Sequence, residues 1–405
     1  MYTTSTKTFV MQTATAQSLQ PRYRIRSIDL LRGLVMIIMA LDHVRDYFHW
    51  SAQLYGPVDL SHTSAPIFLT RWITHFCAPV FMFLTGTSAF LVGQRKTIKE
   101  LSFFLLTRGL WLMFLDVGII NFAWGFNFHF PVILLGTLWA LGVSMVALSV
   151  LIYLPVKAIL FIGISIVAGH DLFDNFHVAG NGLKAFLWDE LHDPRPINFY
   201  GHTIITGYPV LPWIGIITLG YCFGNLYNKE FSAVKRKTWL LLLGSGAIIL
   251  FIIIRAINIY GDPQPWSSQN SKLFAFLSFM RVTKYPPSLL YSLITLGPAI
   301  IFLAFAEKPL NRVTEFINVY GRVPMFYYLI HIYLIHLLAM LAAQLTGFGW
   351  KAMVADIFPE VKGYGFPLFG VYLVWIGVVL ALYPLCKWYD RYKTAHKEKW
   401  WLSYL

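Results

Sequence analysis

Residues 27–50 read SIDLLRGLVMIIMALDHVRDYFHW, an apolar run whose charged residues lie near its two ends. A helix needs about 20 mostly apolar residues to cross the hydrocarbon core of a bilayer. The run is long enough to do so, and it predicts a membrane-spanning helix over residues 28–48.

Further apolar runs follow along the chain, and 57% of the residues are hydrophobic while only 13% are charged. Soluble domains carry about 25% charged residues. The sequence therefore predicts an all-α, polytopic membrane bundle of about ten transmembrane helices. The predicted spans are 28–48, 70–93, 101–121, 131–151, 155–170, 208–226, 238–258, 286–306, 317–345 and 366–387. The expected organisation is a cytoplasmic tail at 1–27, a transmembrane domain at 28–390 and a basic cytoplasmic tail at 391–405.

The basic residues, which give a net charge of +13, fall mainly in short segments between the apolar runs. With the N-terminus inside, nineteen Lys and Arg residues lie in inner segments and seven lie in outer loops. Positive charge is enriched on the cytoplasmic side of membrane proteins. This split predicts a multi-pass protein of the cell membrane with both termini in the cytoplasm. Nucleic acid is not an expected partner, because no basic module stands apart from the spans.

The first span carries a polar stripe. Successive helical residues turn by about 100°, so Asp29, Arg32, His43 and Tyr47 fall on one face. A histidine can accept a proton near neutral pH, and a carboxylate can orient its ring. Asp42 is adjacent in sequence. The alternative interpretation is that Asp42 and His43 are wetted residues at the rim of the membrane.

Two later spans also carry polar residues, which are costly inside a bilayer and often functional. In the predicted ninth span, Tyr327 and His331 share a face, and Arg322 lies at the cytoplasmic end. In the third span we expect Arg108 or Asp116 to form an ion pair with another helix. The three cysteines have no metal-ligand spacing, so no metal is expected.

Four stretches together resemble the catalytic domain of the heparan-α-glucosaminide N-acetyltransferases and their bacterial relatives. They are SIDLLRGLVMIIMALDHVRDYF (27–48), ITHFCAPVFMFLTGTSAFL (73–91), TKYPPSLLYSLITLGPA (283–299) and YGRVPMFYYLIHIYLIH (320–336). The resemblance covers about residues 24–390. It implies a multi-span enzyme that takes acetyl-CoA from the cytosolic side and acetylates a glucosamine amine on the far side of the membrane.

The resemblance also implies an active-site histidine near the outer end of the first span or in the following loop, where His43, His49 and His62 lie. Measured from Arg32, His43 falls where the family has an active-site asparagine, and the ungapped position of the histidine holds Leu54. His331 lies at the family's distance from a glycine, here Gly321.

We therefore expect a membrane acyltransferase that moves an acetyl or other short acyl group from cytoplasmic acyl-CoA to an amine or hydroxyl of an envelope glycan or amino sugar. His43, oriented by Asp42 or by another helix, is the expected general base, with His49 and His62 as alternatives. Direct transfer and a histidyl-acyl intermediate both remain open. The donor-binding residues are expected to be Arg32, Arg108, Arg322, Tyr327 and His331.

The rival hypothesis is a proton-coupled transporter or flippase, because intramembrane ionisable residues would serve transport equally well. A labelled acetyl-CoA assay separates the two classes, since only an acyltransferase releases CoA. The lipid bilayer is an expected partner in either case, and the sequence is compatible with a homodimer.

Overall fold

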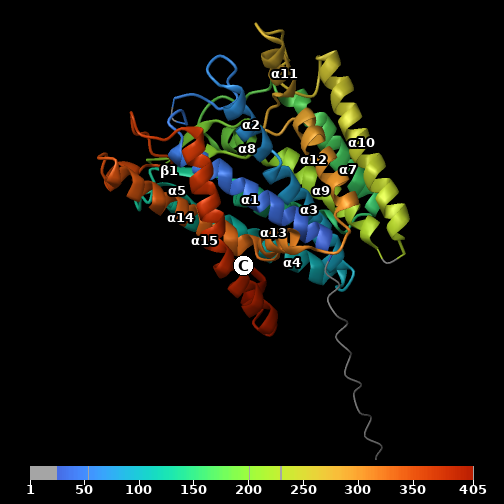
Figure 1. Cartoon of the computed structure of the whole chain (residues 1–405). Helices are drawn as coiled ribbons and strands as arrows, with labels where there is room; N and C mark the ends of the chain where they lie inside the picture. The colour runs from blue at the N-terminus through green and yellow to red at the C-terminus, as the bar shows by residue number, and fades with distance from the viewer. Residues whose placement is uncertain (1–24, 53, 200, 229, 405) are drawn as a thin grey trace, which may run out of the picture.

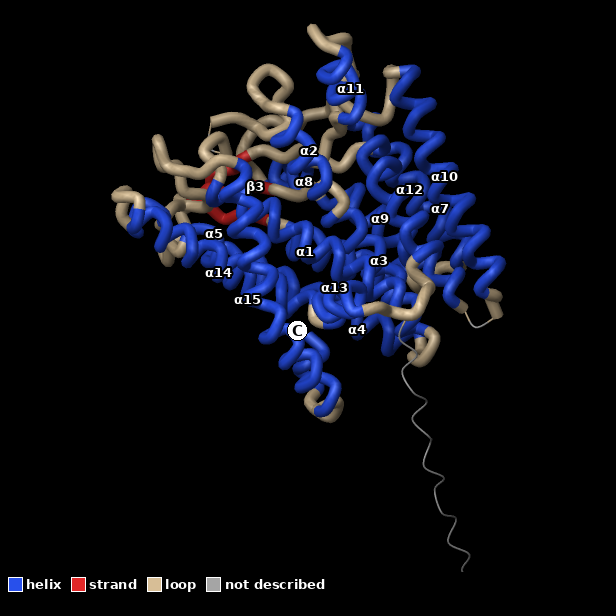
Figure 2. The backbone as a smooth tube through the Cα atoms, in the orientation of Figure 1, coloured by secondary structure: helices blue, strands red, loops and turns tan. Residues whose placement is uncertain are grey.

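The computed structural model describes residues 25–52, 54–199, 201–228 and 230–404. Within these ranges the chain is mainly helical (Figure 1; Figure 2). The helices of the first half are α1 (Arg26–Phe48), α2 (Ala65–Thr74), α3 (Cys77–Gly93), α4 (Ile98–Leu115), α5 (Asn121–Gly125), α6 (Thr137–Leu151), α7 (Val156–Gly169) and α8 (Leu183–Leu191). Those of the second half are α9 (Val210–Phe223), α10 (Ala233–Ile257), α11 (Lys272–Met280), α12 (Leu289–Phe305), α13 (Arg312–Arg322), α14 (Pro324–Leu345) and α15 (Leu368–Ala395).

The chain is an all-α, polytopic membrane protein, but the predicted number of ten spans is wrong. In the described ranges, seven helices are long and apolar enough to cross a membrane. They are Ala65–Gly93, Ile98–Gly125, Val156–Phe173, Val210–Tyr227, Ala233–Ile257, Pro324–Leu345 and Leu368–Ala395. The other three predicted spans fail for physical reasons. Helices α6 and α12 are apolar but only 15 and 17 residues long, and α1 is 23 residues long but carries six charged side chains.

Helix α1 lies in the middle of the bundle, where it packs against α2, α3, α12, α13, α14 and α15 (Figure 1). Its approach to α13 is unusually close. A β-carbon on Gly33 would lie 2.1 Å from the Ile317 carbonyl oxygen, and one on Gly321 would lie 1.8 Å from the Asp29 carbonyl oxygen. Small residues let membrane helices meet backbone to backbone in this way. The contact fixes α1 next to the chain segment that leads into α14.

A small sheet interrupts the helical pattern. Strands β1 (Val132–Leu135), β2 (Pro196–Phe199) and β3 (His202–Thr206) pair in the order β1-β3-β2, with β1 and β3 parallel and β2 and β3 antiparallel. The predicted span at 131–151 is therefore wrong at its start, because residues 132–135 form a strand and the helix begins only at Thr137. β1 pairs with β3 from a loop about 70 residues later, a long-range contact that local sequence pattern does not reveal.

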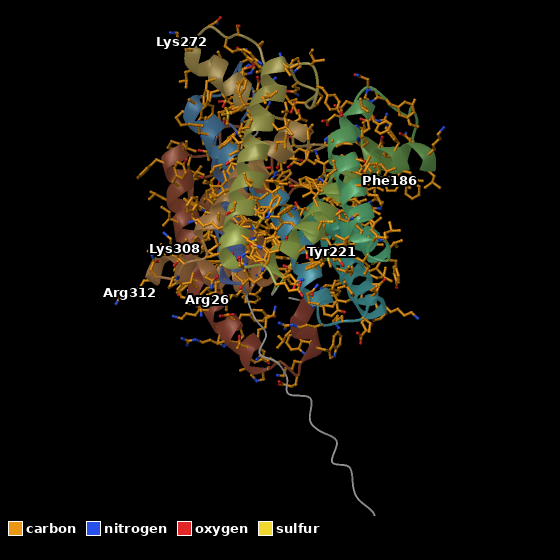
Figure 3. All side chains as sticks on the ribbon, turned by 90° about the vertical axis from the view of Figure 1, so that its right-hand side faces the viewer. Arg26, Phe186, Tyr221, Lys272, Lys308 and Arg312 are labelled. Carbon is orange, nitrogen blue, oxygen red and sulfur yellow. The ribbon has the colours of Figure 1, made fainter. Side chains whose placement is uncertain are left out.

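The two ends of the bundle differ. The start of α1 and the end of α15 lie at one end, here called the terminal end (Figure 1). The long connections 171–207 and 259–285 lie at the opposite end, here called the loop end. Figure 3 shows Arg26, Lys308 and Arg312 toward the terminal end and Lys272 at the loop end. The sheet also belongs to the loop end, so the chain builds most of its irregular structure there.

Candidate active site

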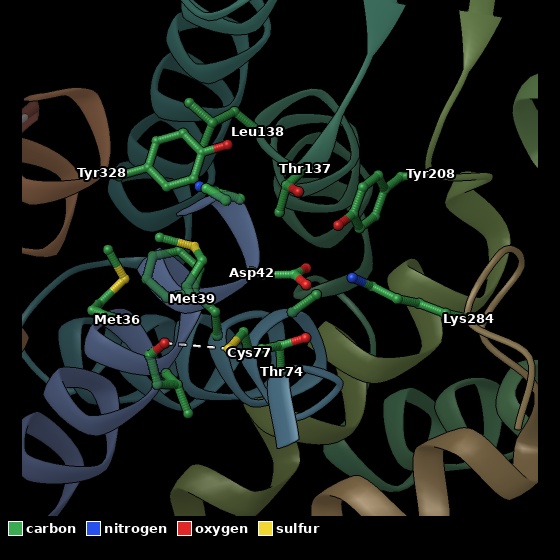
Figure 4. A pocket seen from close by; sticks show the side chains of 14 residues that line it. Met36, Met39, Asp42, Thr74, Cys77, Thr137, Leu138, Tyr208, Lys284 and Tyr328 are labelled. Carbon is green, nitrogen blue, oxygen red and sulfur yellow. Dashed lines mark hydrogen bonds between the residues drawn. The ribbon is translucent and has the colours of Figure 1, made fainter. Parts of the chain in front are cut away.

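Two cavities meet beside the last turns of α1. The wide cavity, about 620 Å³, lies among α1, α2, the sheet and the loops of the loop end. The narrow cavity, about 40 Å³, lies between α1 and α3 and reaches Val35, deeper in the bundle (Figure 4). Six residues line both cavities: Asp42, His43, Thr137, Tyr208, Lys284 and Tyr328. They mark the junction at which a group from one cavity could meet a group from the other.

His43 lies at this junction, and its ring is held from another helix. Its Nδ1 is 2.8 Å from Nε2 of His331 on α14, and Nδ1 of His331 is 3.0 Å from the Tyr327 carbonyl oxygen. A carbonyl oxygen only accepts, so Nδ1 of His331 carries a proton, and in the neutral ring its Nε2 is an acceptor. His43 must then donate through Nδ1–H. This leaves Nε2 of His43 with a free lone pair, as a proton acceptor requires.

Ring contacts support the same geometry. The His43 and His331 rings are stacked with centroids 5.0 Å apart, and the Trp124 ring meets His43 edge-on at 4.9 Å. Tyr327 stacks on the other histidine at 5.0 Å, so the predicted shared face of Tyr327 and His331 is confirmed. His331 is fully buried and lines neither cavity. His331 therefore touches the junction through His43 and through the Tyr328 ring, whose centroid lies 5.7 Å from its own.

Asp42 lines both cavities, but its carboxylate is engaged with arginines and not with the His43 ring. Arg71 of α2 donates to one carboxylate oxygen, and Arg45 lies 3.0 Å from the other. Arg45 also pairs with Asp46. Of the two orienting groups considered for His43, the structure thus contains the one from another helix. Asp42 instead anchors a buried ion-pair network at the wall of the wide cavity.

Lys284 is a residue of the junction that sequence reasoning missed. It precedes α12, is 8% exposed, and its ammonium lies 5.6 Å from the Tyr208 ring centroid and 5.0 Å from that of Tyr285. Figure 4 shows its amine pointing toward the Asp42 carboxylate. In the sequence Lys284 counts only as an outer-loop charge. The signal that could have found it is its place inside TKYPPS, directly before an apolar run.

The alternative histidines lie elsewhere. His49 is buried just beyond α1, where its Nδ1 accepts the Ser51 N–H at 3.2 Å. His62 is exposed in the following loop, with Nδ1 2.8 Å from the Asp59 carboxylate. Neither is among the described residues that line the two cavities. The structure therefore brings His43 and Asp42 together at the junction, while His49 and His62 remain predictions.

Two of the arginines expected at the donor site are engaged with polar partners. Arg32 lies 3.0 Å from Asp29, on the polar face predicted for both, and it donates to the Ser88 hydroxyl at 2.9 Å. Arg322 lies 2.8 Å from Asp390 and 2.7 Å from Glu315. Both are at the terminal half of the bundle, and a phosphate arriving there would exchange with these partners.

Arg108 has an aromatic setting on α4. Its guanidinium carbon lies 3.9 Å from the Phe104 ring centroid and 5.3 Å from that of Tyr404. The prediction that a charged residue of the third span forms an ion pair with another helix is wrong for Asp116. That carboxylate accepts the backbone N–H groups of Gly136 at 2.6 Å and Leu138 at 3.3 Å, and so caps the start of α6. Asp116 lines the wide cavity as well.

Residues 24–256 match the family model described as "Heparan-alpha-glucosaminide N-acetyltransferase, catalytic". The match covers more than half of the chain and includes α1 with His43, while α14 lies beyond its end. No curated protein matches the chain.

Proposed function

We propose that this chain, which belongs to the heparan-α-glucosaminide N-acetyltransferase catalytic family, transfers an acetyl or other short acyl group from acyl-CoA to an amine or hydroxyl group of an envelope sugar. The observation that carries the proposal is that His43 lines both cavities while its Nδ1 is held by His331, which leaves Nε2 as the nitrogen able to accept a proton. One cavity suits a bulky acceptor and the other a slender thioester arm.

In the proposed reaction the sugar occupies the wide cavity. As its nitrogen or oxygen attacks the thioester carbonyl carbon, His43 Nε2 takes the proton from the attacking atom. The new C–N or C–O bond forms, the C–S bond breaks, and the CoA thiolate leaves and receives that proton from His43. The hydrogen bond from His43 Nδ1–H to His331 persists throughout. General base catalysis of this kind contributes about 10²–10⁴-fold to rate.

Lys284 is the proposed partner of the developing oxyanion. Its side-chain amine lies at the junction, and preorganised donors at that point are among the largest contributions to acyl transfer. Its position beside Tyr208 and Tyr285 holds the side chain in the cavity wall. Lys284 also hydrogen-bonds with the Tyr285 side chain and points toward Asp42, so an oxyanion would bind to it by exchange with these partners.

The donor would approach from the terminal end. The narrow cavity reaches Val35, and Arg32 lies one helical turn beyond it, about 16 Å along α1 from His43. A space of about 40 Å³ is far too small for a nucleotide. We therefore assign the CoA phosphates to the arginines of the terminal half, Arg32, Arg108 and Arg322. Arg322 would bind them by releasing Glu315, the more exposed of its two partners.

The membrane orientation in this proposal rests on the distribution of Lys and Arg residues. Arg26, Lys308 and Arg312 lie toward the terminal end (Figure 3), and the nineteen-to-seven distribution of Lys and Arg in the sequence supports a cytoplasmic position for that end. The wide cavity would then face outward, toward a sugar acceptor. Tyr327 and His331, assigned by sequence to the donor site, are reassigned here to the positioning of His43. A histidyl-acyl intermediate on Nε2 of His43 is the alternative to direct transfer.

The test uses the full-length protein in sealed proteoliposomes with labelled acetyl-CoA and glucosamine. We expect release of CoA and labelling of the sugar, reduced by about 10²–10⁴-fold in His43→Ala. His49→Ala and His62→Ala are made in parallel, and loss of turnover in one of these alone would move the base into the outer loop. If wild-type protein releases no CoA above protein-free vesicles but accumulates a solute in a proton-dependent manner, the transporter hypothesis replaces this one.

A further inference from the structure

A second cluster of chemically reactive side chains lies at the loop end, apart from both cavities. His170 begins the short helix that follows α7 (His170–Phe173), Asp174 follows that helix, and His192 follows α8. Their potential ligand atoms all lie within 4.8 Å of one another, and His192 Nε2 is 3.0 Å from an Asp174 carboxylate oxygen. Two segments, the end of α7 with its short helix and the end of α8, thus converge on one point.

The cluster contains buried polar atoms that lack partners. His170 is 1% exposed, yet among the described residues neither of its ring nitrogens makes a hydrogen bond of good geometry, although the Pro287 carbonyl lies beside the ring. Nδ1 of His192 is also buried without a partner. Each such group loses its hydrogen bonds to water on burial without gaining new ones. A ligand that accepts imidazole lone pairs would offset this loss.

Asp171 adds a further unpaired atom. Its Oδ1 lies 3.3 Å from His170 Nε2 and has no hydrogen-bond partner in the described chain, while its Oδ2 accepts the Leu289 N–H at 3.0 Å. The second oxygen therefore fixes the carboxylate against the start of α12. The first lies beside His170 and is positioned to orient its ring from outside a coordination sphere.

We propose that His170, Asp174 and His192 bind a zinc ion, with a water molecule as the fourth ligand. Two imidazoles and one or two carboxylates suit Zn²⁺ in tetrahedral coordination, whereas Mg²⁺ and Ca²⁺ prefer all-oxygen sites. Spacing in sequence gives no hint of this site, because the two histidines are 22 residues apart and belong to no metal motif.

The role of this ion is to fix one wall of the wide cavity. Pro194 lines that cavity and lies two residues after His192, and Pro287, beside His170, lies three residues after Lys284. A metal that joins the ends of α7 and α8 would hold both neighbouring segments in place. The site is structural and takes no part in acyl transfer, so it stands independently of the proposed reaction.

The experiment measures zinc on the full-length protein, purified through a histidine-free tag, stripped with a chelator and dialysed against Zn²⁺ alone. We expect about one zinc per chain and an increase in thermal stability. His192→Gln should lower zinc affinity by at least about 10–100-fold, the range that loss of even an outer-shell partner produces. His177→Gln is the matched control, because His177 lies in the same connection but is exposed and pairs with Asp193.

Cobalt provides a second readout. Co²⁺ in the wild-type site should show the visible absorption of a tetrahedral complex, and His192→Gln should abolish it. If His192→Gln does not fold, Asp174→Asn replaces it, since Asp174 is partly exposed and better able to tolerate the change. Wild-type protein that binds no zinc, or a folded ligand variant that binds as much as wild type, would overturn the proposal.

Discussion

Replacement of His331 by leucine tests whether the hydrogen bond to His331 determines which ring nitrogen of His43 carries the proton. In the wild type, His43 Nδ1–H has an acceptor 2.8 Å away. In the variant that buried N–H is unpaired, at a cost of about 1–3 kcal/mol. The ring escapes this cost by moving its proton to Nε2, where the wide cavity can solvate it, but that tautomer cannot accept a proton from the acceptor sugar.

The population of the active tautomer then falls by the same free energy, which corresponds to about 5- to 150-fold in kcat. His331→Gln is the rescue variant, because its amide oxygen can accept the Nδ1–H of His43. We expect it to recover most of the lost turnover. The KM for acetyl-CoA should stay unchanged in both variants, since His331 is fully buried and lines neither cavity.

The assay is CoA release under saturating acetyl-CoA, with chromatography and thermal unfolding as controls for correct folding. A folded His331→Leu protein with wild-type kcat would refute the tautomer argument. A raised KM with unchanged kcat would instead return His331 to the donor-binding role that the sequence suggested. A loss of kcat that glutamine does not rescue would indicate that the imidazole itself carries protons.

Four other outcomes are expected. Lys284→Met should lower kcat by about 10²–10³-fold while Lys284→Arg retains most activity, as measured by CoA release, because the charge supports the oxyanion. Arg322→Ala should weaken acyl-CoA binding by about 1–3 kcal/mol in calorimetry; an unchanged affinity would assign Arg322 a purely structural role. A cysteine at exposed Ser267 should react with an impermeant reagent on intact cells and one at Lys308 only after lysis, and the reverse result would invert the topology. Burial raises the pKa of Glu190 to about 7, so between about pH 5 and pH 7 the folded state holds a proton that the unfolded state does not. The unfolding temperature of the wild type should therefore fall as the pH rises from about 5 to about 7. Glu190→Gln, which has no proton to lose, should show a smaller fall over the same range.

The polar face of α1 could be predicted from sequence because a single helix fixes the relative directions of its own side chains. Asp29 and Arg32 do pair, and His43 does line the cavities. The helix that packs against this polar face of α1 could not be predicted, because the helical period of one segment carries no information about which other segments lie beside it. His43 and His331, which are in contact, are 288 positions apart in the sequence.

Other features were missed because they depend on how loops fold back. Lys284 becomes buried because Asp262, from the start of the same long connection, accepts the Thr283 N–H at 2.7 Å and the Ser288 hydroxyl proton at 2.8 Å. These bonds turn a nominal surface loop into part of the cavity wall. The sheet was missed for a similar reason, since β1 finds its partner strand only after the intervening helices have packed.

The charges that make α1 a poor lipid-facing span make it suitable as the central helix of the site. A charged side chain in a bilayer is costly unless it is paired, and α1 is enclosed by other helices that supply the partners. Asp42 is matched by Arg45 and Arg71. Among the described residues that line the narrow cavity, Asp42 and Lys284 are the charged ones. With Asp42 already matched, a thioester carbonyl in that cavity would meet the positive charge of Lys284 next to the lone pair of His43, which is the pairing that acyl transfer requires.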